Sequence, residues 1–508
     1  MKINQLINHG LVAAVMVAAV VPAYAANDVV RVGMDVDAQS LDPRTQRNTT
    51  DVRVLDLLYD GLVSLDQSLT PQPNLALSWE QPDATTLIFD IRTDAKFHDG
   101  TPVTVDDVIY TYETVVDPAL ASNHASNLNA IDSVTAGDDN TVVFKLKAPF
   151  APLLSYMDLG IVPKHLAEAG HDLSTQPVGS GPFTFGQWDR GSQIVLNANA
   201  DYYGGVSATA QVVFVPLADN SARAQALEAG SLDIIMAPLN ADDTIRLRAD
   251  DRFQSVSKPG IKITYVNFNT RSPLLSDPAL RRALSMLIDN QTIGNDIFGG
   301  VETPATSILM PVFEWAYDAS ITQPAFDIAA ASAALDELGW VVGADGIREK
   351  DGVKLAFTLA THSEDSARIQ SVEYIQNLMM AAGVQANVSI SDFPAFIGEV
   401  IGGSYDAALL GWDNLVDPDV LMYVTLHTGE SRNWGAYSNP ETDAQLERAR
   451  TAQTQQERGE AYKAAARLLV EDMPYYVLTN AGFDAFAAAD VTGFDPDVLG
   501  NLRSLTKD

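Results

Sequence analysis

Cysteine is absent from the 508 residues of the chain. The chain therefore cannot form a disulfide framework, a cysteine-ligated zinc site, an iron–sulfur cluster or a cysteine nucleophile. It also lacks the cysteine that carries a lipid at the cleavage site of some exported proteins, so we expect no lipid anchor.

Positive charge is scarce as well. Lysine and arginine total 32 residues against 66 aspartates and glutamates, which gives a formal net charge of −34 at pH 7. A field of this sign repels nucleic acids and anionic membranes, so we expect neither as a partner. We attribute the acidity to solubility and infer no cationic ligand from it.

Long apolar runs are missing except near the start of the chain. There Lys2 precedes an apolar stretch from Leu11 to Val21, and Pro22 leads into Ala23-Tyr24-Ala25. This is the layout of a cleavable signal peptide, and the stretch is shorter than the roughly 20 residues that span a bilayer. We expect residues 1–25 to be removed and the rest to reach a Gram-negative periplasm, because an unanchored protein would diffuse away from a cell with one membrane.

The usual catalytic motifs are also missing. Neither Gly-x-Ser-x-Gly nor His-Glu-x-x-His occurs, and the spacing of His165 and His171 does not place both in adjacent turns of one helix face. Two Ser-x-x-Lys matches, at Ser255 and Ser504, lack the partner motifs of penicillin-recognising enzymes. We therefore expect no enzyme, no metal site and no cofactor, with a secreted hydrolase kept as an alternative.

What the chain does contain is an alternation of strand and helix patterns. Apolar residues alternate with polar ones in 85–92 and again in 142–146, which favours half-buried strands. Thr104 with Asp107 forms a capping-box pattern, and Asp277-Pro278 is a second helix start. A mixed α/β fold of roughly two to four structural units follows from these patterns and the length.

An ordered set of short motifs runs along nearly the whole chain. The motifs are 40–43, 59–63, 76–79, 89–92, 96–108, 177–183, 201–203, 267–269, 281–284 and 437–441. Most of them are turn glycines, prolines at helix starts or core aromatics, so we expect few to touch a ligand. In order and spacing the motifs resemble those of the family 5 extracellular solute-binding proteins, the peptide and nickel binders of ABC importers.

The resemblance implies two lobes joined by two crossing strands, with a ligand cleft between the lobes. Lobe I would comprise 26–266, with an extra subdomain at about 60–180, and lobe II would comprise 267–475. Residues 476–508 would return to lobe I. The crossings are expected near 265–269 and 475–480.

The resemblance also implies a function. The chain would be the substrate-binding subunit of an ABC importer, which captures di- or oligopeptides between closing lobes and delivers them to the membrane permease. We expect a monomer. Alternative solutes are a nickel chelate, an opine, a glutathione-like compound or an oligosaccharide, and an adhesion or chaperone-like surface protein is a third class.

Ligand residues in lobe II are expected after Trp412. In peptide-binding relatives an aspartate three residues after a tryptophan holds the ligand ammonium, but here the stretch is one residue shorter and Asp413 directly follows Trp412. Asp413 or Asn414 could fill the role, and Trp412 is either a pocket wall or a core residue. Asp417 is a candidate ligand residue whose alternative is to cap the helix that starts at Pro418.

Further candidates come from two other segments. In relatives the segment after Asp42-Pro43 contacts the ligand, which places Arg47, Asn48 and Thr49 at the cleft. Arg47 could pair with a ligand carboxylate or phosphate through its planar fork, or remain a solvated loop residue. His362 falls near a position where a relative binds the ligand carboxylate.

Overall fold

The computed structural model describes residues 29–508 except positions 139, 414, 497, 504 and 508. The signal peptide expected at 1–25 and the candidate residue Asn414 therefore lie outside the described residues. Within the described part of the chain, no helix is both long and apolar enough to cross a membrane. The fold is mixed α and β, as the alternating sequence patterns predict.

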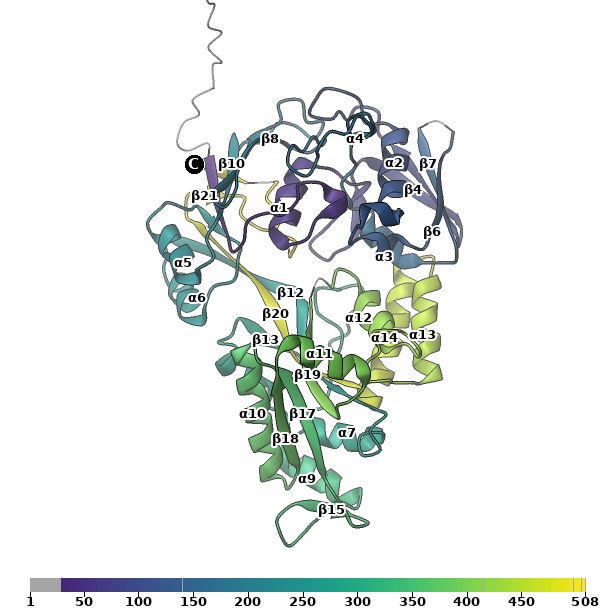
Figure 1. Ribbon diagram of the computed structural model, residues 1–508, viewed down its shortest axis with the longest axis vertical. Helices are drawn as coiled ribbons and strands as arrows, with labels where there is room; N and C mark the ends of the chain where they lie inside the picture. Colours follow the sequence, from purple (N-terminus) through teal and green to yellow (C-terminus); the bar gives the residue numbers. More distant parts are fainter. Residues whose placement is uncertain (1–28, 139, 414, 497, 504, 508) are drawn as a thin grey trace, which may run out of the picture.

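One sheet of 11 strands runs through both halves of the molecule (Figure 1). Two antiparallel strands at its centre, β12 (Phe253–Phe268) and β20 (Tyr475–Ala488), continue from one half into the other. β12 is buried at every position in 263–268, and β20 at every position in 475–480. This is the pattern of strands covered on both faces. We call the half that contains β1 lobe I and the half that contains β17 lobe II.

Lobe I carries the strands on the far side of β20, in the order β11-β1-β10-β9-β8. Helices pack against this part of the sheet because its strands supply a continuous apolar surface. The strands are β1 (Val29–Met34), β8 (Phe183–Asp189), β9 (Gln193–Ala198), β10 (Gln211–Pro216) and β11 (Ile234–Ile235), and the helices are α1 (Thr49–Leu58), α5 (Asn220–Glu228) and α6 (Ala241–Arg248).

A subdomain with a sheet and a core of its own is attached to lobe I (Figure 1). Its four antiparallel strands follow the order β4-β5-β7-β6. Tyr112 packs edge-on against Phe144, with ring centroids 5.0 Å apart, and fastens a helix to this sheet. The elements are β4 (Ala76–Asp83), β5 (Thr86–Ile91), β6 (Ile131–Ala136), β7 (Thr141–Leu146), α2 (Val105–Val116), α3 (Ala125–Leu128), the 3-10 helix η4 (Ala151–Tyr156) and α4 (Lys164–Glu168).

Lobe II is built on the other end of the large sheet, in the order β18-β17-β19-β12. A second core fills the space between these strands and their helices. A small three-stranded sheet lies at the end of lobe II farthest from lobe I (Figure 1). The elements are β13 (Glu302–Pro304), β14 (Val341–Val342), β15 (Arg348–Lys350), β16 (Val353–Lys354), β17 (Ala356–His362), β18 (Gln385–Ser391), β19 (Ala407–Trp412), α7 (Pro278–Ser285), α9 (Ile328–Glu337), α10 (Ser366–Ala381) and α11 (Phe393–Gly402).

Three helices before β20 lie beside the subdomain of lobe I (Figure 1). Arg450 donates to both carboxylate oxygens of Asp419 at 2.8 Å, and its guanidinium lies 5.4 Å from the ring centroid of Phe150 in the subdomain. The segment that the sequence analysis assigns to lobe II therefore also contacts the subdomain. The helices are α12 (Pro418–Leu426), α13 (Pro440–Thr451) and α14 (Gln455–Asp472).

Several local signals form as the sequence predicts. Thr104 and Asp107 make a capping box at the start of α2, and the side chain of Asp277 caps α7, in which Pro278 is in the first turn. Gly179 lies in one of the shared motifs, where an added Cβ would sit 1.9 Å from the carbonyl oxygen of Leu58. The motif glycine is thus required for packing against α1 and serves the scaffold.

Candidate functional site

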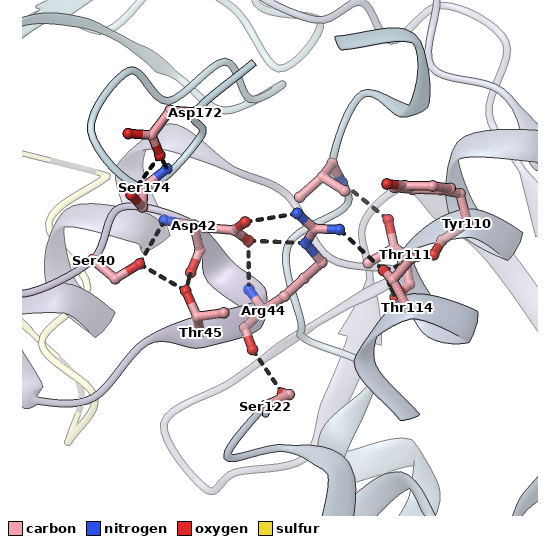
Figure 2. Close-up of polar contacts among 11 residues, drawn as sticks. Ser40, Asp42, Arg44, Thr45, Tyr110, Thr111, Thr114, Ser122, Asp172 and Ser174 are labelled. Atoms are coloured by element: carbon pink, nitrogen blue, oxygen red, sulfur yellow. Dashed lines mark hydrogen bonds and ion pairs between the residues drawn. The ribbon is translucent and has the colours of Figure 1, made fainter. Parts of the chain in front are cut away.

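The segment after β1 is fixed to the subdomain by a buried ion pair (Figure 2). Arg44 donates from Nε and Nη2 to the two carboxylate oxygens of Asp42, at 3.0 and 2.7 Å. A third donor, Nη1, reaches Thr114 of α2 at 3.1 Å, while Ser122 donates to the Arg44 carbonyl at 2.6 Å. The Asp42-Pro43 motif therefore anchors this segment to the subdomain and fixes the position of residues 47–49, which follow it.

Those next residues are the lobe I candidates at the start of α1. Asn48 accepts a hydrogen bond from the backbone of Asp51 at 2.8 Å and donates to the carbonyl of Asp37 at 3.2 Å, so its side chain is used as a helix cap. Arg47 and Thr49 are exposed, and neither side chain has a hydrogen bond or ion pair within the described residues. Of the three candidates, Arg47 and Thr49 keep side chains that are free to meet a solute.

Trp412 ends β19 and pairs in register with Ile263 of β12. Because Ile263 lies midway along a strand that comes from lobe I, this end of β19 is the edge of lobe II nearest to lobe I. The Trp412 ring stacks on Trp434 with centroids 5.1 Å apart and an interplanar angle of 28°, and Arg432 lies 5.7 Å from its centroid. Trp412 is half-buried, so part of its ring packs on the core and part remains exposed.

Asp413 sits at the exposed tip of the loop that follows. The loop is held on one side by Trp412 and on the other by Leu415, whose amide donates to the carbonyl of Ile261 at 2.9 Å. Asp413 itself has no hydrogen bond or ion pair with another described residue. Its carboxylate is therefore an uncommitted negative charge beside the tryptophan wall.

Asp417 has a different environment. It is 1% exposed, and Arg458 donates to both of its oxygens at 2.5 and 2.8 Å. Ser155 of the subdomain adds a hydrogen bond at 2.8 Å, and the backbone of Asp419 adds the cap that the sequence predicts, also at 2.8 Å. Burial disfavours the Arg458 charge, but Asp417 outweighs this and raises the arginine pKa. With its lone pairs occupied, Asp417 joins the loop to the subdomain.

His362 ends β17, the parallel neighbour of β19, so the two carboxyl ends meet at the same edge of the sheet. The ring is only 8% exposed. Nδ1 lies 3.0 Å from Glu364, and Nη1 of Arg368 donates to Nε2 at 3.0 Å, which assigns the proton to Nδ1. The histidine thus orients an arginine.

Arg368, on α10, is the residue that the motif comparison missed. Its guanidinium presses on Gly411, where an added Cβ would lie 2.1 Å from Nη2, and Nε is 3.3 Å from Asp365. The side chain remains 11% exposed. Two features of the sequence could have pointed to Arg368: it lies six residues after His362, and a glycine precedes Trp412. Neither feature indicates a contact until β17, β19 and α10 are packed together.

The geometry at this edge of lobe II is that of a binding site. The exposed carboxylate of Asp413 follows Trp412, Arg368 lies over Gly411 of the same strand, and Arg47 is exposed in lobe I. Within the described residues there is no cluster of three or more histidines or carboxylates that could hold a metal ion.

Comparison with known proteins decides the family. Residues 70–433 match the family described as "Bacterial extracellular solute-binding proteins, family 5 Middle". The chain belongs to this family. Its members are substrate-binding proteins of transport systems and not enzymes, so the chain is a solute-binding protein that acts in the periplasm or outside the cell.

Three relatives illustrate the match. The chain is 33% identical to Protein XP55 of Streptomyces lividans over 433 residues, which cover 83% of this chain and 78% of the relative. It is 27% identical to the Oligopeptide-binding protein AppA of Bacillus subtilis, over 85% of this chain and 82% of the relative. The structure of HbpA2 from Haemophilus parasuis superposes with a TM-score of 0.85 at 22% identity, covering 94% of this chain and 100% of that one. The two-lobed fold that the sequence motifs imply is confirmed.

Two aspartates of the loop allow a direct test of structural against binding roles. Asp417→Ala should lower the free energy of unfolding by about 3–5 kcal/mol, because it leaves Arg458 buried without its counter-charge. Asp413→Ala, which removes a carboxylate from an exposed position of the same loop, should change it by less than about 0.5 kcal/mol. Urea denaturation of both variants measures the difference, and equal losses would contradict the assignment.

Proposed function

We propose that the chain captures di- and oligopeptides between its lobes and presents them to an ABC permease. The observation that carries the proposal is the exposed carboxylate of Asp413, which has no partner among the described residues and directly follows Trp412, while Arg368 lies over Gly411 of the same strand. A free peptide has an ammonium at one end and a carboxylate at the other, and charge-assisted hydrogen bonds to both ends fix its position. The family membership and the name of the Bacillus subtilis relative support a peptide as the solute.

Each residue has a separate task in this proposal. Asp413 receives the ammonium, Arg368 receives the carboxylate, and Trp412 packs on the peptide between them. Arg47 and Thr49 reach the peptide from lobe I when the lobes close. Asn48, Asp417 and His362 hold these groups in place without touching the peptide.

Closure is proposed to take place about β12 and β20. The pairing of the two strands shifts register between Pro259 and Ile263 and again between Thr264 and Tyr265, just where the strands leave lobe I. Such irregularities interrupt the ladder and increase the local twist, which allows the two ends of a strand to move as separate bodies. The closed monomer would then be the form that the permease recognises.

Native mass spectrometry of protein purified without denaturation tests the nature of the solute. We expect the folded protein to carry a series of small peptide masses that are lost on denaturation, because closed lobes retain their ligand. One mass corresponding to a nickel chelate, an opine or an oligosaccharide would contradict the peptide proposal.

The role of Asp413 can be tested with matched peptides. Asp413→Ala should weaken the binding of a tripeptide with a free amino terminus by about 2–5 kcal/mol, measured by calorimetry, because the ammonium loses its partner. The same tripeptide acetylated at its amino terminus should bind the variant and the wild type equally. Asp251→Ala, which removes an exposed acid outside the site, is the control.

Equal weakening of the free and the acetylated peptide would show that Asp413 does not hold the ammonium. The unfolding curve of the variant is recorded in parallel, so that a loss of binding is not mistaken for a loss of fold.

A further inference from the structure

A cavity of about 170 Å³ opens in lobe I beside the candidate site. Its walls come from α1, from the segment that follows η4 and from the C-terminal segment, and they include Asp56, His124, Asp158 and Arg503. We call it the Asp158 cavity. Its volume is far above the roughly 15 Å³ that one water molecule requires, so it has room for a chain of several atoms.

Segments from both lobes contribute to the wall of the Asp158 cavity. Gln46, which precedes Arg47, forms part of its wall, and so does Val416 from the loop that begins at Trp412. Ser155, another wall residue, makes the hydrogen bond to Asp417 that joins this loop to the subdomain. The cavity is therefore an extension of the cleft between the Arg47 segment and the Trp412 loop.

The charged residues that line the cavity differ in whether they have a partner of opposite charge. Arg503 is engaged by two acids, with Nη1 2.6 Å from Asp60 and Nη2 3.4 Å from Asp56. Asp158 faces the open space of the cavity, and no other described side chain makes a hydrogen bond or ion pair with it. One carboxylate thus remains without a counter-charge.

The pKa of Asp158 reflects the lack of a counter-charge. Asp158 is exposed at the cavity surface, but the protein atoms packed around its carboxylate, together with the negative charge of Asp56, raise its pKa to about 7. A cation that enters the cavity would stabilise the ionised carboxylate, because no positively charged side chain among the described residues pairs with Asp158. His124 does not supply it, since burial lowers the pKa of its ring and keeps it neutral at pH 7.

We propose that the Asp158 cavity is a subsite for a cationic side chain of the solute, with Asp158 as its counter-charge. This inference rests on the proposed function and narrows it, because it assigns the protein to basic peptides that carry lysine or arginine. A lysine side chain places its ammonium on a flexible four-carbon stem, which suits a cavity lined by apolar residues such as Leu55 and Val416 and by a carboxylate. A divalent metal ion is a poor occupant, because one uncommitted carboxylate falls short of the oxygen ligands that such ions require.

Calorimetry with tripeptides tests the proposal. The probes are alanine tripeptides that carry lysine at the first, second or third position, each matched with a methionine tripeptide of similar length and no charge. At pH 8 the wild type should bind the lysine peptide at one of the three positions at least tenfold more tightly than its methionine partner. Asp158→Asn should abolish this preference, whereas Asp251→Asn, with the same change of net charge at an exposed site, should retain it.

The pH dependence is a second readout. Because Asp158 is ionised above its raised pKa and protonated below it, the preference for lysine should fall about tenfold between pH 8 and pH 6 in the wild type. The methionine peptides correct for the titration of the peptide amino group. The isosteric Asp158→Asn variant loses one charge at an exposed position, so it should fold and show no such pH dependence.

Three results would overturn the inference. The first is a wild type that binds lysine and methionine peptides alike at every position. The second is a preference that survives Asp158→Asn. The third is a failure of all tripeptides to bind, which contradicts the proposed function itself and can be told apart from the first two, in which peptides still bind.

Discussion

The ladder between β12 and β20 is the constraint on which the rest of the molecule depends. These two strands continue through both lobes, so they carry the backbone hydrogen bonds that make one sheet out of two halves. Their fully buried segments, 263–268 and 475–480, lie in lobe II; one register shift lies just before Ile263 and the other lies between Thr264 and Tyr265. The ladder therefore connects the two lobes, and its register shifts provide a hinge about which the lobes can rotate.

A second principle is the division of charged residues between structure and binding. Asp42 with Arg44 and Asp417 with Arg458 are buried ion pairs, and each pair joins a cleft segment to the subdomain. A buried pair of this kind keeps its partners in one geometry because losing either partner strands a charge away from water. What remains uncommitted at the cleft, Arg47, Asp413 and Asp158, is what we assign to the solute.

Much of the fold could be predicted from local sequence. The capping box at Thr104, the cap and proline at Asp277 and the strand at 86–91 depend on neighbours within a few residues, so their patterns survive without tertiary information. The motifs between 40 and 441 also sufficed to name the family. Asp417 shows the limit of such signals. Its role as a helix cap could be predicted from the adjacent Pro418, but its partners Arg458 and Ser155 come from distant segments and could not.

The site was harder to predict for the same reason. Arg368 reaches β19 only because β17 and β19 are parallel neighbours and Gly411 leaves space for the guanidinium. Asp158 has no local pattern at all, since its significance comes from a cavity with walls from α1, the loop after Trp412 and the C-terminal segment. Carrying over family positions gave His362, and the structure adds Arg368 as a further candidate because it donates to the histidine ring.

The central claim is that a peptide binds between the lobes and closes them. Small-angle X-ray scattering of the purified protein, with and without a saturating tripeptide, tests it most directly. The account predicts that the radius of gyration falls when the peptide is added, because lobe I and lobe II approach each other about β12 and β20. A peptide that binds by calorimetry and leaves the scattering curve unchanged would contradict it.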